Sequence, residues 1–274
     1  MSASEGAADC HGRRPLAAAL VLLAIGATIA AGVVRRGTGE GARCGPGFLA
    51  ASARCLPDPV RPCPPPLAPS PLGCDAPDVR VLVPETTLVL GPSDWEAEGR
   101  VTPRTLHAGA FRIDAFEVTW GRWGGATGGD AARAASGMTA AEAADFCARQ
   151  SPGGRLPTED EWIVAAVAGT ARTPRYPWGE TGAVCRRGAW GLRSGPCAKG
   201  GSGPDTVGSH PTGDSALGLH DLAGNVAEWI APGLAAKGGS WASDLAAELR
   251  IWARLELPSG ARDPRVGVRC VYPP

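Results

Sequence analysis

An unbroken apolar run near the N-terminus limits what the rest of the chain can fold into. Residues 16–34, LAAALVLLAIGATIAAGVV, are nineteen uncharged and mostly apolar residues, and Arg35-Arg36 follows them. Nineteen residues are just enough for a helix that spans a bilayer. A buried helix of a soluble domain is the weaker interpretation, because the run is terminal and a linker follows it. We therefore predict a polar segment over 1–14 and a transmembrane signal-anchor or signal peptide over 15–36.

The sequence leaves open whether this segment stays in the membrane. Ala30-Ala31-Gly32 offers small residues for cleavage, although the run is somewhat long for the apolar part of a signal peptide. Arginine counts on its two sides are similar, so the positive-inside rule does not orient it. Abundant Arg, Ala, Gly and Pro suggest a bacterial source. We expect a protein of the bacterial cell envelope, anchored through 16–34 with its domain outside the cytoplasm, or secreted if the segment is cleaved.

Two similar cysteine units follow in a Pro-rich stretch, residues 37–78. Cys44 to Cys55 and Cys63 to Cys74 both read C-x10-C, with Pro two residues after the first Cys. Repeated spacing in an extracytoplasmic protein favours disulfides within each unit, although four Cys allow three connectivities. Zinc is disfavoured because the C-x2-C pairs of structural zinc sites are missing. We predict both disulfides, and we interpret the stretch as a stiff stalk.

From Val79 onward the composition is that of a folded domain, residues 79–274. Alternating residues predict short strands, at 79–83, 87–90 and 111–119. Capping boxes at Thr139-Ala-Ala-Glu142 and Thr158-Glu-Asp-Glu161 predict the starts of two helices. Gly and Pro are frequent after the second helix, so loops with brief strands are expected there.

The charge balance argues against a nucleic-acid partner. The chain has 27 basic and 27 acidic residues and no basic run beyond paired arginines. Its nine Trp outnumber the two Tyr and four Phe, and such Trp can anchor a core where regular structure is scarce.

The stretch Gly218–Trp229, GLHDLAGNVAEW, contains a strong turn signal. Gly224-Asn225 favours a turn because both residues tolerate positive φ. Asp221 and Glu228 flank that turn, so two carboxylates can meet the carbonyls that it exposes. Such an all-oxygen environment suits hard cations such as Ca²⁺. The alternative is an ordinary loop with solvated acids.

Five ordered motifs resemble the formylglycine-generating enzyme (sulfatase-modifying factor) family over residues 79–274. The motifs are Phe116-Glu-Val-Thr119, Gly154–Trp162, Gly218–Trp229, Gly238-Gly-Ser-Trp241 and Gly267-Val-Arg-Cys270. The resemblance implies an α+β fold, a formylglycine-generating-enzyme-like (C-type-lectin-like) domain with little regular secondary structure. It also implies a structural calcium site, formed by Asp221, Gly224, Val226 and Glu228.

The same resemblance locates a departure from the family's chemistry. In this family two thiolates just after Gly-Gly-Ser bind Cu(I), a soft ion that selects sulfur. Here the first position is Ser243, the second falls between Ala246 and Glu248, and no Cys lies between Cys197 and Cys270. We therefore expect no copper, no catalytic residue of this type and no formylglycine generation.

The preferred interpretation is a binding or scaffold module for an unknown protein or small molecule. Its concave surface is expected near Trp241 and the 185–215 loops. The alternative is an oxidoreductase of the same superfamily, of the formylglycine-generating or the non-haem iron type, with an unrecognised site. Iron-binding relatives use three histidines, partly on an added helical-bundle domain. Here the domain has only His107, His210 and His220 and no helical bundle is expected, so three surface or loop histidines are the favoured interpretation. A serine nucleophile is disfavoured because the Gly-x-Ser-x-Gly elbow is missing.

The remaining cysteines fit a structural role. Cys147 and Cys270 match positions that form a disulfide in the family that the chain resembles. Cys185 and Cys197 lie twelve apart in a Gly-rich loop, which a disulfide would close. Cys10 precedes the apolar run and is left over.

Overall fold

The computed structural model describes residues 48–51, 54–57, 63–93, 97–125, 130–168, 170 and 172–274. The predicted segments 1–14, 15–36 and the membrane run 16–34 lie outside these residues, as do Cys10 and Cys44. Within the described ranges, no helix has both the length and the apolar character needed to cross a membrane.

Two of the helices begin where their capping boxes predict. The α-helices of the described part are α1 (Trp120–Trp123), α2 (Ala140–Gln150) and α3 (Glu159–Val167). Thr139 caps α2 and Thr158 caps α3, and in both helices the glutamate three residues later bonds back to the cap. Each reciprocal pair satisfies backbone N–H groups that a helix start leaves free, so these starts depend on local sequence alone.

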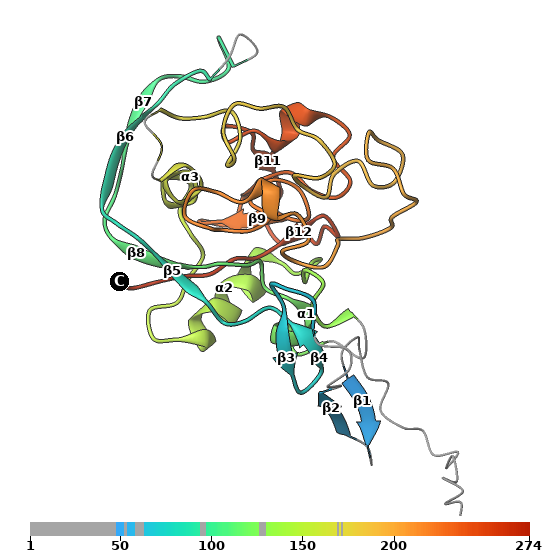
Figure 1. Ribbon diagram of the computed structural model, residues 1–274. Coiled ribbons are helices and arrows are strands. Elements are labelled where there is room, and N and C mark those ends of the chain that lie inside the picture. Colours follow the sequence, from blue (N-terminus) through green and yellow to red (C-terminus); the bar gives the residue numbers. More distant parts are fainter. Residues whose placement is uncertain are drawn as a thin grey trace, which may run out of the picture. The chain divides into compact units, whose positions relative to one another are not determined.

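Strands are short and form several small sheets (Figure 1). They are β1 (Phe48–Ala51), β2 (Arg54–Pro57), β3 (Ala68–Ser70), β4 (Gly73–Asp75), β5 (Arg80–Val83), β6 (Thr86–Leu90), β7 (Arg104–Ala108), β8 (Phe111–Asp114), β9 (Ala227–Ile230), β10 (Ala235–Lys237), β11 (Leu255–Glu256), β12 (Val266–Gly267) and β13 (Val271–Tyr272). The larger sheets have the orders β11-β10-β9-β12 and β13-β8-β5. The β12–β9 pair is parallel and the other strand pairs are antiparallel. Few helices and mixed sheets agree with the expected α+β fold.

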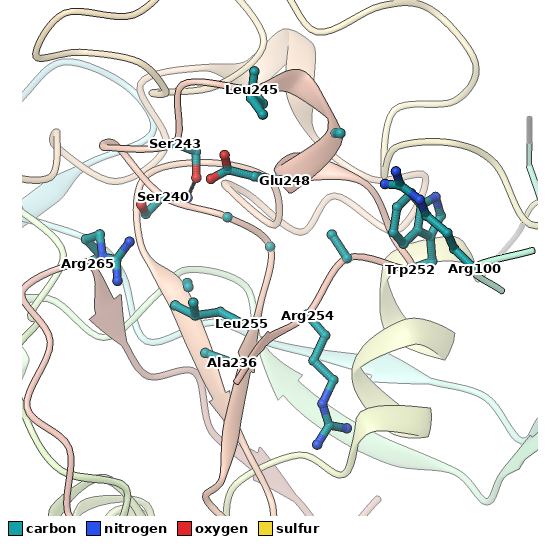
Figure 2. Close-up of a pocket in the computed structure, with 15 residues that line it drawn as sticks. Arg100, Ala236, Ser240, Ser243, Leu245, Glu248, Trp252, Arg254, Leu255 and Arg265 are labelled. Carbon is teal, nitrogen blue, oxygen red and sulfur yellow. Dashed lines mark hydrogen bonds between the residues drawn. The ribbon is translucent and has the colours of Figure 1, made fainter. Parts of the chain in front are cut away.

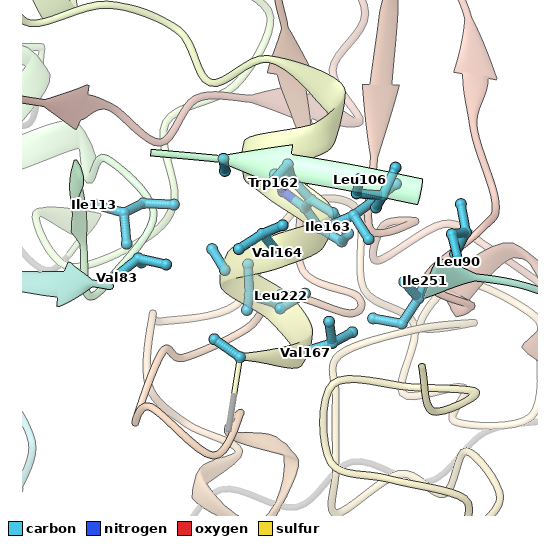
Figure 3. Packing of buried hydrophobic residues seen from close by; sticks show 14 of the residues in the cluster. Val83, Leu90, Leu106, Ile113, Trp162, Ile163, Val164, Val167, Leu222 and Ile251 are labelled. Carbon is cyan, nitrogen blue, oxygen red and sulfur yellow. The ribbon is translucent and has the colours of Figure 1, made fainter. Parts of the chain in front are cut away.

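The main core surrounds α3. Figure 3 shows Val83 and Ile113 on one side of this helix, and Leu90, Leu106 and Ile251 on the other. All six residues from Trp162 to Val167 are buried, so α3 is enclosed beyond its first turn.

A second core cluster links α2 to the C-terminal strands. Cys147 of α2 forms the predicted disulfide with Cys270, and both residues are fully buried. Phe146, Trp229 and Tyr272 belong to the same cluster. The bond therefore ties α2 to the chain end next to β13.

The second cysteine unit packs against the domain instead of forming a stalk. Cys63 and Cys74 form the predicted disulfide, and β3 and β4 make a hairpin between them. Leu67 and Ala76 pack against a cluster that contains Phe116. This packing differs from the expected stalk, because the apolar residue four positions after the first Cys finds a hydrophobic partner.

The first unit has the same hairpin register. Ala50 pairs with Cys55 in β1 and β2, just as Pro69 pairs with Cys74 in β3 and β4. The two C-x10-C units are therefore structural equivalents. The Cys44–Cys55 disulfide stays a prediction, because Cys44 lies outside the described residues.

Candidate functional site

A cavity lies beside the Gly-Gly-Ser segment, at the position where the resemblance places the family's two thiolates. It has a volume of about 350 Å³. Ala227 of β9 and Ala236 of β10 contribute to its lining, with Gly238, Gly239 and Ser240. Figure 2 shows Ser243 and Glu248 pointing into this cavity.

The backbone can form this cavity only with glycine at residue 239. Its φ is +70°, and a Cβ there would lie 2.7 Å from Leu249 and 2.8 Å from the Glu248 carbonyl oxygen. The backbone at Gly239 therefore lies directly against the short 3-10 helix η3 (Ala246–Leu249). The Gly-Gly pair therefore determines how closely the two segments that line the cavity approach each other.

Ser243 has a structural role at the first family position. Its hydroxyl accepts a hydrogen bond from the Ser240 amide at 3.1 Å, and its amide donates to the Ser240 carbonyl at 3.0 Å. The residue thereby closes a tight turn. Among the described lining residues there is no histidine, which is the usual base beside a nucleophilic serine.

Charged side chains at the cavity are tied to carboxylates around it. Arg254 pairs with Glu159 at 2.6 Å and also bonds Glu256. Arg265 pairs with Asp263 at 2.6 Å. These pairs hold two guanidinium groups in place.

Lys237 is buried and lies in sequence between Ala236 and Gly238, two residues that line the cavity. Its ammonium donates to Glu159 at 3.2 Å and to the carbonyl of Ala253 at 3.0 Å. Burial lowers the pKa of Lys237 to about 8, against the opposing effect of Glu159. Since Ala253 lines the cavity, Lys237 anchors part of the cavity wall.

Glu228 lies in a second group of functional candidates and accepts from two protein donors. One carboxylate oxygen accepts from the Trp162 indole at 2.7 Å, and the other accepts from the Arg269 Nε at 2.8 Å. Glu228 and Arg269 are both fully buried. Arg269 also donates to the carbonyls of Asp114 and His220.

Asp221 and Asn225 adopt the left-handed conformation that the turn requires. Their φ values are 56° and 55°. Asp221 is buried and accepts from the Gly208 amide at 2.5 Å. Asn225 donates to Glu117 at 2.5 Å, and the Val226 amide donates to the same carboxylate at 3.0 Å.

Glu117 was missed as a site residue in the sequence. It was expected within a strand over 111–119, where alternation with Phe116 and Val118 would place it outward. The strand β8 ends at Asp114, and Glu117 is only 1% exposed. Its position inside the Phe-Glu-Val-Thr motif is the signal that could have identified it.

The buried group carries more negative than positive charge. Glu117, Asp221 and Glu228 lie near the Arg269 guanidinium, and His210 and His220 also act on Asp221. Burial raises the pKa of Glu117 well above its usual range, and the carboxylates of Asp221 and Glu228 raise it further. Burial likewise raises the pKa of Asp221. An added cation would relieve this excess.

The comparisons with known proteins agree with this geometry. Residues 74–273 match the family described as the Sulfatase-modifying factor enzyme 1-like domain. The chain belongs to this family. The match includes Cys74, in keeping with the packing of the second cysteine unit against the domain.

One sequence relative and two solved structures are similar to this chain over different shares of its length. The hercynine oxygenase of Mycolicibacterium thermoresistibile is 40% identical over 82 residues, which are 28% of this chain and 16% of that protein. Treponema denticola variable protein 1 superposes with a TM-score of 0.58 and 22% identity, over 71% of this chain and 95% of the other. PvdO from Pseudomonas aeruginosa superposes with a TM-score of 0.58 and 18% sequence identity, over 71% of this chain and 94% of PvdO. The two structures establish the shared fold.

The sulfatase-modifying-factor domain of this chain does not fit copper at the family position. Ser243, Ala247 and Glu248 line the cavity there, so its donors are oxygen atoms. Cu(I) prefers sulfur donors. Cys197 and Cys270, which flank this stretch in sequence, are both in disulfides.

The three histidines have different side-chain partners. His107 is exposed and contacts Thr87, while His220 bonds Asp214 at 2.9 Å. His210 lies 3.7 Å from Asp205. Within the part of the chain that the structure describes, no group of three or more His, Cys, Asp or Glu is placed to hold a metal ion.

The expected concave surface near Trp241 corresponds to the cavity that Ser240 and Ser243 line, and Trp241 itself is buried. Trp241 is 1% exposed, and its indole donates to the Pro264 carbonyl at 3.3 Å. Cys185 and Cys197 form the predicted disulfide, and Cys197 packs against Trp241. The 185–215 loops thus cover Trp241, and the cavity lies on the neighbouring residues 238–240.

Proposed function

We propose that this chain is an extracytoplasmic binding module of the sulfatase-modifying factor family that works without copper. The carrying observation is the cavity beside Gly239, which is lined by Ser243 and Glu248 where the family has thiolates. A cavity of about 350 Å³ is within the size range of small-ligand sites. Its ligand is an unknown protein segment or small molecule.

The location forms part of the proposal. The disulfides Cys63–Cys74, Cys147–Cys270 and Cys185–Cys197 favour an oxidising compartment. The apolar run 16–34 supports a membrane anchor or a cleaved signal. The protein then belongs to the bacterial cell envelope.

A structural Ca²⁺ at Asp221, Gly224, Val226 and Glu228 is also proposed. The excess of buried carboxylates over Arg269 supports it, because a divalent cation would balance that charge. Two carboxylates supplemented by carbonyl oxygens and water suit the irregular coordination of Ca²⁺. Against it, both Glu228 oxygens already accept from protein donors.

Copper binding tests the central claim. Purified protein is titrated with Cu(I) against a chelator and incubated with a Cys-x-Pro-x-Arg peptide. We expect no retained copper and no formylglycine, whereas the Ser243→Cys/Glu248→Cys variant should gain Cu(I) affinity. Copper-dependent conversion of the peptide by the unmodified chain would overturn the proposal.

A fragment screen tests the cavity itself. Small organic fragments observed by protein NMR should shift the signals of Gly239 and Ser243. Ala247→Trp should remove these shifts by filling the cavity, and Ala198→Trp, at an exposed position outside it, should leave them. Fragments that still shift these signals in the Ala247→Trp variant would reject the cavity as the binding site.

The second candidate function is an oxidoreductase that uses another site. The 40% identity to a hercynine oxygenase over 82 residues favours it. Metal analysis and oxygen uptake separate the candidates. Stoichiometric iron together with oxygen consumption would favour the enzyme. The absence of both from correctly folded protein would favour the binding module.

A further inference from the structure

The Cys185–Cys197 disulfide differs in exposure from the other disulfides that the structure describes. Cys147 and Cys270 are fully buried, and Cys74 is buried as well. Cys185 is exposed to solvent and Cys197 is half-buried. An attacking thiolate must reach a sulfur atom before it can exchange with a disulfide, so exposure makes Cys185–Cys197 the most accessible of these bonds.

The charge around this disulfide is positive. Residues 185–199, CRRGAWGLRSGPCAK, contain three Arg and one Lys and no acidic residue. The Arg193 guanidinium lies over the ring of Trp241, 5.4 Å from its centroid. Nearby cations stabilise a thiolate, and a disulfide breaks faster when its leaving sulfur is stabilised as a thiolate. The sequence around the bond therefore favours its exchange.

The two sides of the disulfide are held to the domain unequally. On the Cys185 side, Arg187 donates to the Thr212 carbonyl at 2.9 Å, and the Thr212 hydroxyl donates back to the carbonyl of Arg186 at 2.7 Å. On the Cys197 side, the Leu192 amide donates to the Trp241 carbonyl at 2.8 Å, and the other backbone hydrogen bonds described for 191–201 are internal to that segment. Opening the disulfide therefore releases mainly the segment that carries Cys197.

This segment covers the inner side of the Gly-Gly-Ser turn. Cys197 packs against the cluster that contains Trp241 and against the cluster that contains Leu249. Trp241 directly follows Ser240, which lines the cavity. Leu249 ends the helix η3, which lies against Gly239. The disulfide is thus one layer of side chains away from the cavity wall.

We propose that Cys185 is a thiol–disulfide exchange site and that opening its disulfide uncovers Trp241 beside the Gly-Gly-Ser cavity. The co-reactant is a dithiol. Its first thiolate attacks the Cys185 Sγ, which forms a mixed disulfide and releases the Cys197 Sγ as a thiolate. Its second thiol resolves the mixed disulfide, so the dithiol loses two electrons and two protons and the protein gains two thiols.

The exchange is independent of the proposed binding function, and only its effect on ligand binding rests on that function. The fragment screen at the cavity is therefore carried out separately on the oxidised and the reduced protein. Fragments that bind neither form would reject the binding module. The exchange and the exposure of Trp241 are judged by the measurements that follow.

Graded reduction of the full chain tests the exchange. Folded protein is incubated with dithiothreitol, and the free thiols are alkylated and mapped by mass spectrometry. Cys185 and Cys197 should be labelled at reductant concentrations about tenfold or more below those that open the other two disulfides. With glutathione in place of dithiothreitol, the mixed disulfide should form on Cys185 and the alkyl group should appear on Cys197.

Matched variants test the consequence for Trp241. Cys185→Ser/Cys197→Ser removes a bond between residues 12 positions apart, and Cys63→Ser/Cys74→Ser removes one between residues 11 apart, so the loss of loop closure is nearly equal. The Trp241 indole N–H should exchange with solvent about tenfold faster or more in the first variant and at the original rate in the second. The same NMR measurement on unmodified protein with only Cys185–Cys197 reduced repeats the test without any substitution.

Three outcomes would overturn the proposal. They are reduction of another described disulfide before Cys185–Cys197, a glutathione adduct on Cys197 in place of Cys185, and equal Trp241 exchange in the oxidised and the selectively reduced protein. The last outcome would leave the disulfide as a closure of its own loop without influence on the cavity.

Discussion

The Arg269 guanidinium donates to the Glu228 carboxylate at 2.8 Å, and neither side chain is exposed to solvent. Motifs far apart in sequence meet in this pair, since Glu228 belongs to the turn motif and Arg269 to the C-terminal one. Trp162 of α3 completes it with an indole hydrogen bond. The pair thus connects three of the family's motifs in the interior.

Loss of Arg269 should be strongly destabilising. Arg269→Met leaves Glu228 charged and buried without its partner, so we expect a loss of about 3–5 kcal/mol in the free energy of unfolding. Urea denaturation measures it. Arg265→Met breaks the more exposed pair with Asp263 and should cost under about 1 kcal/mol. Similar losses for both variants would show that burial of the pair has no special effect.

Calcium should raise the melting temperature. A divalent cation would balance the carboxylates of Glu117, Asp221 and Glu228, which Arg269 alone does not neutralise. Asp221→Ala should abolish the increase, and Asp244→Ala, at an exposed position, should preserve it. Differential scanning calorimetry with calcium and with chelator provides the measurement. An unchanged melting temperature on chelation would show that these carboxylates do not hold calcium.

Because Lys237 is buried, the free energy of unfolding should increase as pH rises from about 8. The folded-state pKa of Lys237 is lowered from 10.5 to about 8, so the unfolded state binds more protons between these values. Stability therefore rises with pH across this window, by up to about 3 kcal/mol. The raised pKa of Tyr272, about 12, acts in the opposite sense and only above pH 10.

Chemical denaturation as a function of pH measures this effect. Lys237→Met should remove the rise, whereas Lys199→Met, at the chain's exposed lysine, should retain it. A rise that persists in Lys237→Met would belong to other groups.

The Cys147–Cys270 disulfide should contribute more stability than the Cys185–Cys197 disulfide, because it closes a much longer loop. It joins residues 123 positions apart. The chain-entropy model gives about 4–5 kcal/mol for a loop of this size. Unfolding of Cys147→Ala/Cys270→Ala, compared with Cys185→Ala/Cys197→Ala, measures the difference. The second pair encloses only 12 residues and should cost less.

Local signals carried most of the correct fold predictions. The capping boxes at Thr139 and Thr158 predicted the helix starts because the bonds involved lie within one helical turn. Equal spacing in the cysteine units predicted Cys63–Cys74. The strand expected over 111–119 was too long, because its last residues turn inward to reach distant partners.

The candidate site was predictable only in part. Sequence placed Ser243 and the stretch from Ala246 to Glu248 where thiolates were expected, and Ser243, Ala247 and Glu248 line the cavity. It predicted a concave surface near Trp241 but did not determine whether Trp241 itself lines that surface or is buried, since tryptophan serves equally as a core anchor and as a binding residue. Only the packing of the 185–215 loops determines which of these roles it has.

By itself, the sequence determined the family, the two main helix starts, the turn at Gly224-Asn225 and the lack of a cysteine pair after Gly-Gly-Ser. These depend on short-range geometry or on residue identity alone. Tertiary structure decided that Glu117 faces inward, that Arg269 neutralises Glu228, and that the 185–215 loops cover Trp241. Such features depend on which distant segments meet, and burial makes each unpaired charge or backbone group costly enough to matter.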